Sequence, residues 1–542
     1  MKNRWIVHPV LFAILPILGL YAHNIGQLAM SDLLVPLALA APASALLWFL
    51  LARRLRDPVR PALIASLFWL WFFSCGHVFA LAVKIPGAAW VIPTRSAFTG
   101  IYAIPLLAGI AVLARCGRNW RPATMILNLV AIVLVAWQVV AIGGYEFKRV
   151  LARRDVARVE LVNAAGVRGV GAPPNIYFII LDAYARADVL KDLYHYDNSA
   201  FLNHLERKGF FVARSGRANY PQTLLSLASC WNLEYLDGLA KQQGPQSSDR
   251  IPLQEMIADS KVGRFLKQRG YQTVAFSTGY EGTDLQLADV HLGQVDGLGQ
   301  FQGTLLDTTA LPAGFVSRWL FGLDEVETHR RRVLYTLEHL ADPARLRPPV
   351  FVFAHIVCPH PPFLFDRRGR PVKLVGDYNL GDGPWAAGSR QAYLAGYREQ
   401  LMFLNRQVEA ALDRLLAVSR YPTVIILEGD HGPGSRWDLA ERDPTAQRER
   451  LANLDAYYLP GGGAPLSEDM SPVNIFRVVF NRYFGAHLPL LPNESYFSTW
   501  GAPYRFTRVT DAVNAKPAAP RLAQRRAARA PGDDPAARVA RD

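Results

Sequence analysis

Three stretches of the 542-residue chain combine acidic, imidazole and hydroxyl side chains where a buried strand ends or a helix begins. Asp182 directly follows one apolar run, and Asp430-His431 follow another run much further along the chain. Two carboxylates and an imidazole form a ligand set that suits Zn²⁺ or Mn²⁺. We therefore expect Asp182, Asp430 and His431 to bind a divalent metal ion.

The hydroxyl belongs to Thr223. Pro221 and the apolar spacing that follows it predict a helix that begins near Thr223. Unpaired N–H groups and the positive end of the helix dipole favour a bound phosphoryl group at such a point. A metal ion beside Thr223 would activate its hydroxyl as a nucleophile. Without a metal ion, threonine at this position is an ordinary helix N-cap.

Buried strands must position these side chains. Nearly continuous β-branched and aromatic runs occupy residues 175–181, 349–354 and 423–427, and a shorter run occupies residues 274–277. Amphipathic helical patterns occupy residues 199–208, 253–268, 325–340 and 389–418. This alternation predicts an α/β domain with a mostly parallel sheet. Ligands bind at the carboxyl ends of the strands in such sheets, so Asp182 and Asp430 are expected to share one crevice.

Residues 471–484, after the last run, are predicted to form a helix. From residue 510 the chain is rich in Arg, Ala and Pro, and a disordered tail is expected there.

The N-terminal part has a different composition. Five windows contain no Asp, Glu, Lys or Arg: residues 6–22, 33–52, 61–83, 97–114 and 123–142. About 20 apolar residues are needed to cross a bilayer, so these windows predict a five-helix transmembrane bundle. The expected organisation is a membrane domain (1–144), a linker helix (145–172), a catalytic domain (173–509) and the tail (510–542).

Basic residues alternate between the loops. The N-terminus carries Lys2 and Arg4, the loop at 53–60 carries four Arg, and the loop at 115–121 carries three Arg, whereas residues 23–32 carry no Lys or Arg and residues 84–95 carry only two. The positive-inside rule then predicts a cytoplasmic N-terminus. Five spans would place the catalytic domain outside the cytoplasm, on a bacterial-type inner (plasma) membrane.

Overall composition excludes several classes of protein. The net charge of +14 comes from 59 Lys and Arg against 45 Asp and Glu, but no zinc-finger, helix-turn-helix or RNA-binding signature accompanies it, so no nucleic-acid partner is expected. Four cysteines in 542 residues exclude a disulfide scaffold. The sequence is compatible with either a bridge between Cys230 and Cys358 or two buried thiols.

Together these elements resemble the alkaline phosphatase and sulfatase superfamily, in particular its membrane-anchored branch, which includes lipoteichoic acid synthase and the lipid A phosphoethanolamine transferases. Asp182 matches the acidic metal ligand after the family's first strand, and Asp430-His431-Gly432 matches its Asp-His pair. Thr223, in a T-x-x-S spacing, matches the transferases' nucleophile. Residues 353–363 resemble the family's histidine segment, in which His360 would contact substrate. Residues 454–459 resemble a late strand of the family, which is expected at the edge of the sheet. His355 is interpreted as a second substrate contact or as a buried core residue.

This resemblance implies a metal-dependent phosphotransferase that uses Asp182, Thr223, Asp430 and His431 as metal ligands. It would move a phosphoethanolamine- or phosphoglycerol-type head group from a membrane phospholipid to an envelope glycan or lipid, through a phosphothreonine intermediate. One alternative is a phosphate or sulfate ester hydrolase, although the sulfatase motif C/S-x-P-x-R is missing at residues 220–227. Another is a non-catalytic membrane scaffold. Residues 432–443 contain no histidine, which departs from several of the transferases.

Overall fold

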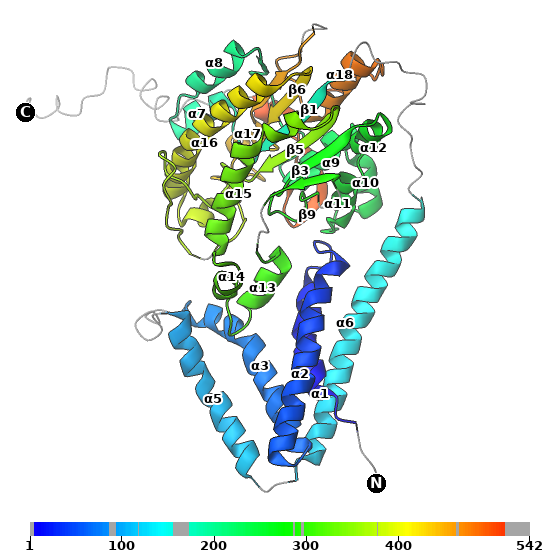
Figure 1. Cartoon of the computed structure of the whole chain (residues 1–542), viewed down its shortest axis with the longest axis vertical. Helices are drawn as coiled ribbons and strands as arrows, with labels where there is room; N and C mark the ends of the chain where they lie inside the picture. The colour runs from blue at the N-terminus through cyan, green and yellow to red at the C-terminus, as the bar shows by residue number, and fades with distance from the viewer. Residues whose placement is uncertain are drawn as a thin grey trace, which may run out of the picture.

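The structure, a computed structural model, describes residues 5–85, 94–116, 119–155, 173–285, 288–293, 297–376, 378–461 and 466–514. A bundle of apolar helices stands at one end of an α/β domain (Figure 1). The bundle contains α1 (His8–His23), α2 (Leu34–Leu55), α3 (Val59–Ala82), α5 (Arg95–Arg115) and α6 (Arg121–Asp155). The described part of the predicted linker helix, residues 145–155, continues α6, and residues 156–172 lie outside the described residues.

Four helical segments among the described residues are long and apolar enough to cross a membrane: Met30–Leu55, Val59–Ala82, Arg95–Arg115 and Arg121–Arg149. α1 has 16 residues. Its length is about 24 Å, which is shorter than the roughly 30 Å hydrocarbon core of a bilayer. The predicted count of five spans is therefore not confirmed.

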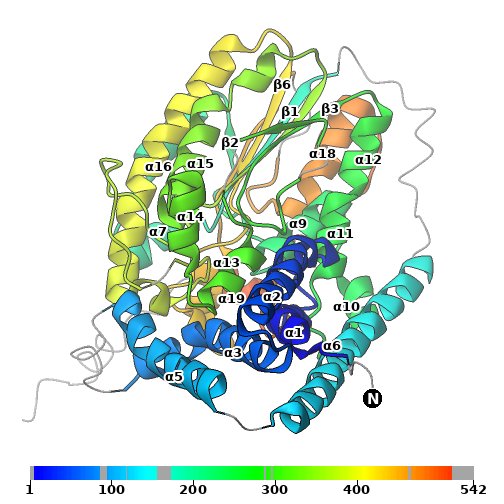
Figure 2. The same ribbon diagram turned by 60° about the horizontal axis from the view of Figure 1, so that its bottom comes forward.

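α1 nevertheless connects the two ends of the bundle. It packs against α2, α3 and α6, and Figure 2 shows it lying among them. At its start, the backbone N–H groups of Val7 and His8 donate to Asn128 near the beginning of α6. Just beyond its end, the carbonyl of Gly26 accepts from the N–H of Arg250 in the α/β domain at 2.6 Å.

The α/β domain is built on a sheet that has seven strands in the described residues, in the order β2-β7-β6-β1-β5-β3-β4. β1 pairs in parallel with β5 and β6, and β3 pairs in parallel with β4 and β5, whereas β7 is antiparallel to β6 and β2. The strands are β1 (Asn175–Leu181), β2 (Phe211–Val212), β3 (Gln272–Phe276), β4 (Val290–Leu292), β5 (Val350–Ile356), β6 (Thr423–Glu428) and β7 (Asp455–Tyr458). The mostly parallel sheet is thus confirmed.

Two details of the sheet differ from the sequence prediction. β7 is not the edge strand, because the two-residue β2 pairs with its outer side. β5 continues through His355 to Ile356, since its pairing with β1 extends to the end of that strand. A separate hairpin is formed by β8 (Tyr496–Thr499) and β9 (Ala502–Arg508).

The helices of this domain cover the two faces of the sheet, whose central strands β1, β5 and β6 are completely buried. They are α7 (Ala187–Tyr194), α8 (Ser199–Arg207), α9 (Thr223–Asn232), α10 (Asp237–Gln243), α11 (Ile251–Ala258), α12 (Lys261–Gln268), α13 (Gln300–Asp307), α14 (Ala313–Phe321), α15 (Glu325–His339), α16 (Arg390–Val418), α17 (Pro444–Leu451), α18 (Pro472–Phe484) and α19 (Thr510–Asn514).

Two helical predictions need correction. The pattern at residues 253–268 forms two helices, α11 and α12, because Ser260 caps a new helix by accepting from the N–H of Gly263. The predicted tail does not begin at residue 510, since Thr510–Asn514 form α19, whose Thr510 and Val513 are buried. Residues 515–542 lie outside the described residues.

A buried carboxyl group on α17 makes the stability of the domain depend on pH. Burial raises the pKa of Glu449 to about 7, although Tyr194, Ser435 and the N–H of Arg436 donate hydrogen bonds to it. The folded state therefore binds a proton that the unfolded state releases near pH 4.5. The stabilisation from this proton is fully present below pH 4.5 and is lost as the pH rises through about 7. The free energy of unfolding falls by about 3 kcal/mol over this range.

Glu449→Gln is expected to remove this part of the pH dependence. Denaturant unfolding measured between pH 5 and 8 should show a flatter stability profile for Glu449→Gln than for the unmodified protein. Glu441→Gln, a change at an exposed surface ion pair with Arg505, should leave the profile as it is. An identical slope in the Glu449→Gln protein would contradict the expectation.

Candidate active site

The carboxyl ends of the two central strands bring the acidic candidates together. Asp182 follows β1 and Asp430 lies two residues after β6, and these strands are neighbours in parallel register. Ala183 adopts a left-handed backbone conformation (φ 63°), and its N–H donates to Asp430 Oδ1 at 3.1 Å. The turn after β1 therefore holds both carboxylates in one place, as the sequence predicted.

His431 is fixed by its own backbone turn. Its Nδ1 lies 2.9 Å from the carbonyl of Gly432, which places the proton of the neutral ring on Nδ1 and makes Nε2 the nitrogen that offers a lone pair. Gly432 is required here because a Cβ would lie 2.0 Å from the carbonyl oxygen of Glu449. The Asp-His-Gly motif thus combines two candidate ligands with a close approach of α17.

The arrangement of these atoms fits a divalent metal ion. Asp182 Oδ1 and Asp430 Oδ2 are buried and have no hydrogen-bond partner. They lie 3.7 Å and 3.3 Å from His431 Nε2, and Thr223 Oγ1 lies 3.2 Å from the same nitrogen. Ligands around a tetrahedral zinc ion are about 3.3–3.6 Å apart. Two orphaned carboxylate oxygens at this spacing have the chemistry of a cation site.

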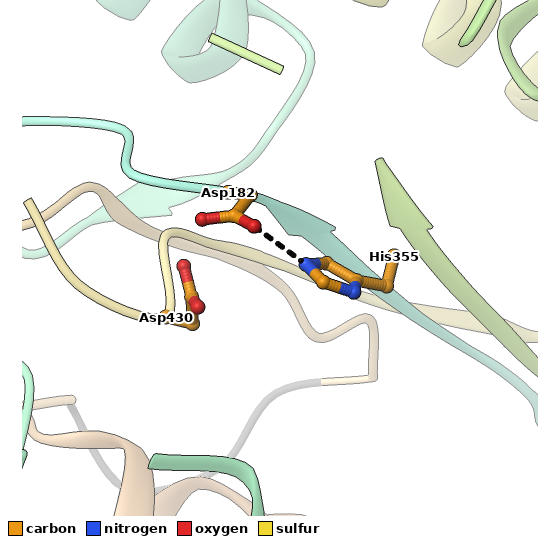
Figure 3. Close-up of side chains that lie close together, drawn as sticks. All are labelled: Asp182, His355 and Asp430. Carbon is orange, nitrogen blue, oxygen red and sulfur yellow. Dashed lines mark hydrogen bonds and ion pairs between the residues drawn. The ribbon is translucent and has the colours of Figure 1, made fainter. Parts of the chain in front are cut away.

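His355 occupies a different position from the predicted substrate contact. Its side chain is fully buried, and its Nε2 lies 3.2 Å from Asp182 Oδ2 (Figure 3). The other ring nitrogen lies 2.8 Å from the hydroxyl of Thr283. Asp182, His355 and Asp430 form a group whose ligand atoms all lie within 4.8 Å of one another. Because both nitrogens of His355 have protein partners, its position suits orienting Asp182.

The charges in the site are consistent with metal binding. Burial, together with Arg450, lowers the pKa of His431 and keeps its imidazole neutral. Burial alone would raise the pKa of Asp182, but the neighbouring His360 and His355 outweigh it, and the pKa is lowered. Asp182 is therefore ionised and His431 unprotonated, which are the states that metal ligands require.

The hydroxyl candidate lies at the start of a helix, as predicted. α9 begins at Thr223, and Gln222 precedes it in an extended conformation without a side-chain cap. All ten residues of α9 are buried. Thr223 Oγ1 therefore faces the metal-ligand candidates from the positive end of a helix that is held rigidly in the core.

A cavity of about 580 Å³ extends from these residues. His360 lines it, as do Asp182, Thr223 and His431. Its other wall belongs to the helix bundle, at the end of α1 and the turn that follows: Leu20, Asn24, Gln27 and Leu28. Aromatic side chains also line it: Tyr280, Phe301, Trp385, Trp437 and Trp500. The volume is within the range of small-molecule sites.

Two further residues of the site were not predicted from the sequence. Arg450, on α17, is buried, and its Nη2 lies 3.2 Å from His431 Nε2. The same guanidinium group forms an ion pair with Asp382 and stacks over Trp437 at 4.8 Å. Oδ2 of Asp382 lies 4.0 Å from Nε2 of His360. No motif marks either residue, because each reaches the site from a segment with no other candidate ligand.

Three other polar side chains near the motifs, those of Cys230, Cys358 and Glu428, have a structural role rather than a role as metal ligands. Cys230 and Cys358 are both buried and free, so they do not form a bridge. Glu428, at the end of β6, pairs in register with Asp455. Burial raises the pKa values of both carboxyl groups, which favours their protonated forms, and a protonated carboxyl group does not suit a metal ligand.

No protein-family model and no curated protein matches the chain. Similar solved structures include phosphoethanolamine transferases and sulfatases, members of the superfamily that the motifs resemble. The periplasmic domain of EptC from Escherichia coli, in complex with Zn, is 11% identical with a TM-score of 0.39, covering 64% of this chain and 95% of that one.

Two more structures show the range of these similarities. The integral membrane protein lipooligosaccharide phosphoethanolamine transferase A from Neisseria meningitidis is 10% identical with a TM-score of 0.38, covering 88% of this chain and 94% of that one. A putative sulfatase from Bacteroides thetaiotaomicron is 13% identical with a TM-score of 0.35, covering 62% and 75%. Such values do not assign a function, which must rest on the residues of this chain.

Proposed function

We propose that this protein is a membrane-anchored, metal-dependent phosphotransferase. Its donor is a membrane phospholipid with a phosphoethanolamine- or phosphoglycerol-type head group, and its acceptor is an envelope glycan or lipid. The proposed metal ligands are Asp182, Asp430, His431 and Thr223, and the proposed ion is Zn²⁺ or Mn²⁺. The reaction passes through a phosphothreonine at Thr223.

One observation carries this proposal. The hydroxyl of Thr223 and the ligand candidates Asp182 and His431 line the same cavity as Leu20, Asn24 and other residues at the end of an apolar helix. A phospholipid that enters from the bilayer would meet this wall with its acyl part, and its phosphate would lie against Thr223. Anchoring to the membrane that contains the donor also raises the donor's effective concentration.

The residues of the chain have separate tasks in this reaction. A bound divalent ion would supply Lewis-acid activation of the Thr223 hydroxyl and neutralise phosphate charge. Thr223 Oγ1, whose proton would pass to solvent when the ion binds, forms a bond to phosphorus while the bond from phosphorus to the diacylglycerol oxygen breaks, and His360 gives that oxygen a proton. His360 then takes the proton of the acceptor hydroxyl, whose oxygen replaces Thr223 on phosphorus. Arg450 contributes a fixed positive charge beside the phosphate oxygens.

The proposed location follows from the distribution of basic residues between the two ends of the bundle. The arginine-rich turn between α2 and α3 (53–60), the end of α5 at Arg115 and the start of α6 at Arg121 lie at the end of the bundle that is distant from the α/β domain. The positive-inside rule places that end in the cytoplasm. The α/β domain then lies outside the cytoplasm, on the outer face of an inner (plasma) membrane.

A labelled donor tests the proposal. The full-length protein, loaded with Zn²⁺ or Mn²⁺, is reconstituted in vesicles that contain phosphatidylethanolamine or phosphatidylglycerol with ³²P in the head group. Expected results are metal-dependent release of diacylglycerol and a mass increase on the peptide that contains Thr223. Release of the free head group in the presence of envelope lipid, with no labelled acceptor, would favour a hydrolase. A scaffold would release no diacylglycerol under any condition.

Arg450→Lys is expected to lower kcat/KM by about 10²-fold, since a flexible ammonium group cannot reproduce the planar guanidinium donors next to the phosphate. Initial rates with the labelled lipid measure this loss, and thermal unfolding checks that the protein still folds. Arg406→Lys, at an exposed position on α16, is the matched control and should leave kcat/KM unchanged. Equal rates for the two variants would remove Arg450 from the proposed role.

A further inference from the structure

The surface of α14 has an unusual distribution of side chains. This helix buries the small residues Ala313 and Ser317, while Phe315 and Trp319 are 61% and 76% exposed. Leu320, next to them, is 53% exposed. A helix at a water-facing surface normally buries its large apolar side chains. The distribution on α14 is therefore the reverse of that expected for a helix whose outer surface faces water.

The segment before α14 is joined to the backbone of α3. The N–H of Gly76 donates to the carbonyl of Thr308 at 2.9 Å, and the N–H of Ala310 donates to the carbonyl of Phe72 at 2.9 Å. Arg95, at the start of α5, donates to the carbonyl of Thr309 at 3.0 Å. These bonds attach residues 308–310 to two helices of the apolar bundle.

Gly76 allows this attachment, because a Cβ there would lie 2.0 Å from the carbonyl oxygen of Asp307. Gly76 is six residues before the end of α3 at Ala82. At 1.5 Å per residue, the contact lies about 9 Å inside the end of this membrane-spanning helix. The loop that leads into α14 therefore lies level with the ends of the bundle helices. In Figure 1, α13 and α14 lie between the helices α3 and α5 on one side and the rest of the α/β domain on the other.

We propose that α14 lies in the boundary between head groups and acyl chains of the leaflet beneath the α/β domain, with Phe315, Trp319 and Leu320 in contact with phospholipid. The partner is the bilayer that the bundle crosses. Continuity with the α3 contact supports it, and so does the helix's composition. Aromatic residues on an apolar face with an exposed Arg318 beside them are typical of helices at a membrane interface. This helix thus adds a membrane contact of the α/β domain to those that the spanning helices make.

Site-directed fluorescence tests this placement. The full-length protein with Cys116→Ser serves as background, because Cys116 is exposed and Cys75, Cys230 and Cys358 are buried. Phe315→Cys and Trp319→Cys are introduced separately and labelled with an NBD probe. The matched control is Tyr421→Cys, an exposed aromatic position just before β6, at the opposite end of the parallel strands from the site.

The proteins are reconstituted in phosphatidylcholine nanodiscs, with and without a doxyl-labelled phospholipid whose quencher is near the head group. Probes at 315 and 319 are expected to show blue-shifted emission, at least twofold quenching by the doxyl lipid, and several-fold weaker iodide quenching than the probe at 421. Iodide quenching equal to that at 421 would overturn the proposal. A blue shift without lipid quenching would also overturn it, since a second protein copy would then cover this face.

Discussion

Thr223→Ala is expected to lower the metal-dependent release of diacylglycerol by roughly 10³-fold or more, because removing a nucleophile eliminates the covalent route to the product. Its hydroxyl lies 3.2 Å from His431 Nε2 at the start of a completely buried helix. No other hydroxyl on α9 lines the cavity. Thr223→Ser should retain measurable turnover, since it keeps the oxygen and loses one methyl group.

The measurement is the initial rate with a head-group-labelled phospholipid, combined with mass spectrometry of the peptide that contains residue 223. Ser229→Ala is the matched control on the same helix. Its hydroxyl donates to the carbonyl of Glu234, so the change should cost about 1 kcal/mol of stability without changing the rate. Full activity of Thr223→Ala would exclude a covalent intermediate at this position.

Metal removal is expected to abolish turnover and to destabilise the protein. An ion present at 1,000 times its dissociation constant stabilises the folded state by about 4 kcal/mol. Chelation leaves the orphaned oxygens of Asp182 and Asp430 beside each other without a counter-ion. We therefore expect a chelator to lower the melting temperature by several degrees and the addition of Zn²⁺ or Mn²⁺ to restore it. The metal that restores turnover at the lower concentration identifies the preferred ion.

Asp430→Asn separates this effect from unspecific chelator damage. The variant loses one proposed ligand, so its melting temperature should be nearly insensitive to chelator and its turnover should fall by at least about 10²-fold. Asp413→Asn, which changes a partly exposed surface ion pair with Lys208, should keep both the activity and the chelator response. If Asp430→Asn bound metal with unchanged affinity, the ligand assignment would be wrong.

The sequence predicted the elements of the α/β domain correctly where the pattern lies within one short segment of the chain. The run at 175–181 is β1 with the same bounds, because a strand buried on both faces must be apolar at every position. The helix start at Thr223 was equally local, since Pro221 and the apolar spacing mark it. The break between α11 and α12 was missed because Ser260 can continue a helical pattern, and only its bond to Gly263 shows that it caps a new helix.

The membrane part shows the limit of composition. Apolar windows identified α2, α3, α5 and α6, but the length of α1 does not confirm a fifth span. The α14 helix was not recognised, because nine residues are fewer than the window over which a helical period can be identified. Its exposed aromatic side chains and its attachment to Gly76 are visible only after the chain has folded.

By itself the sequence determined the residue types that could bind a cation and the parallel strands that end next to them. Asp182, Asp430 and His431 could be selected because each lies just after the end of a strand. Parallel strands place their carboxyl ends at one edge of the sheet. Only the tertiary structure decided that His355 contacts the carboxylate of Asp182, and that Arg450 and Asp382 line the site. The physical reason is that strand direction is encoded locally, whereas side-chain contacts between distant segments depend on how the layers pack.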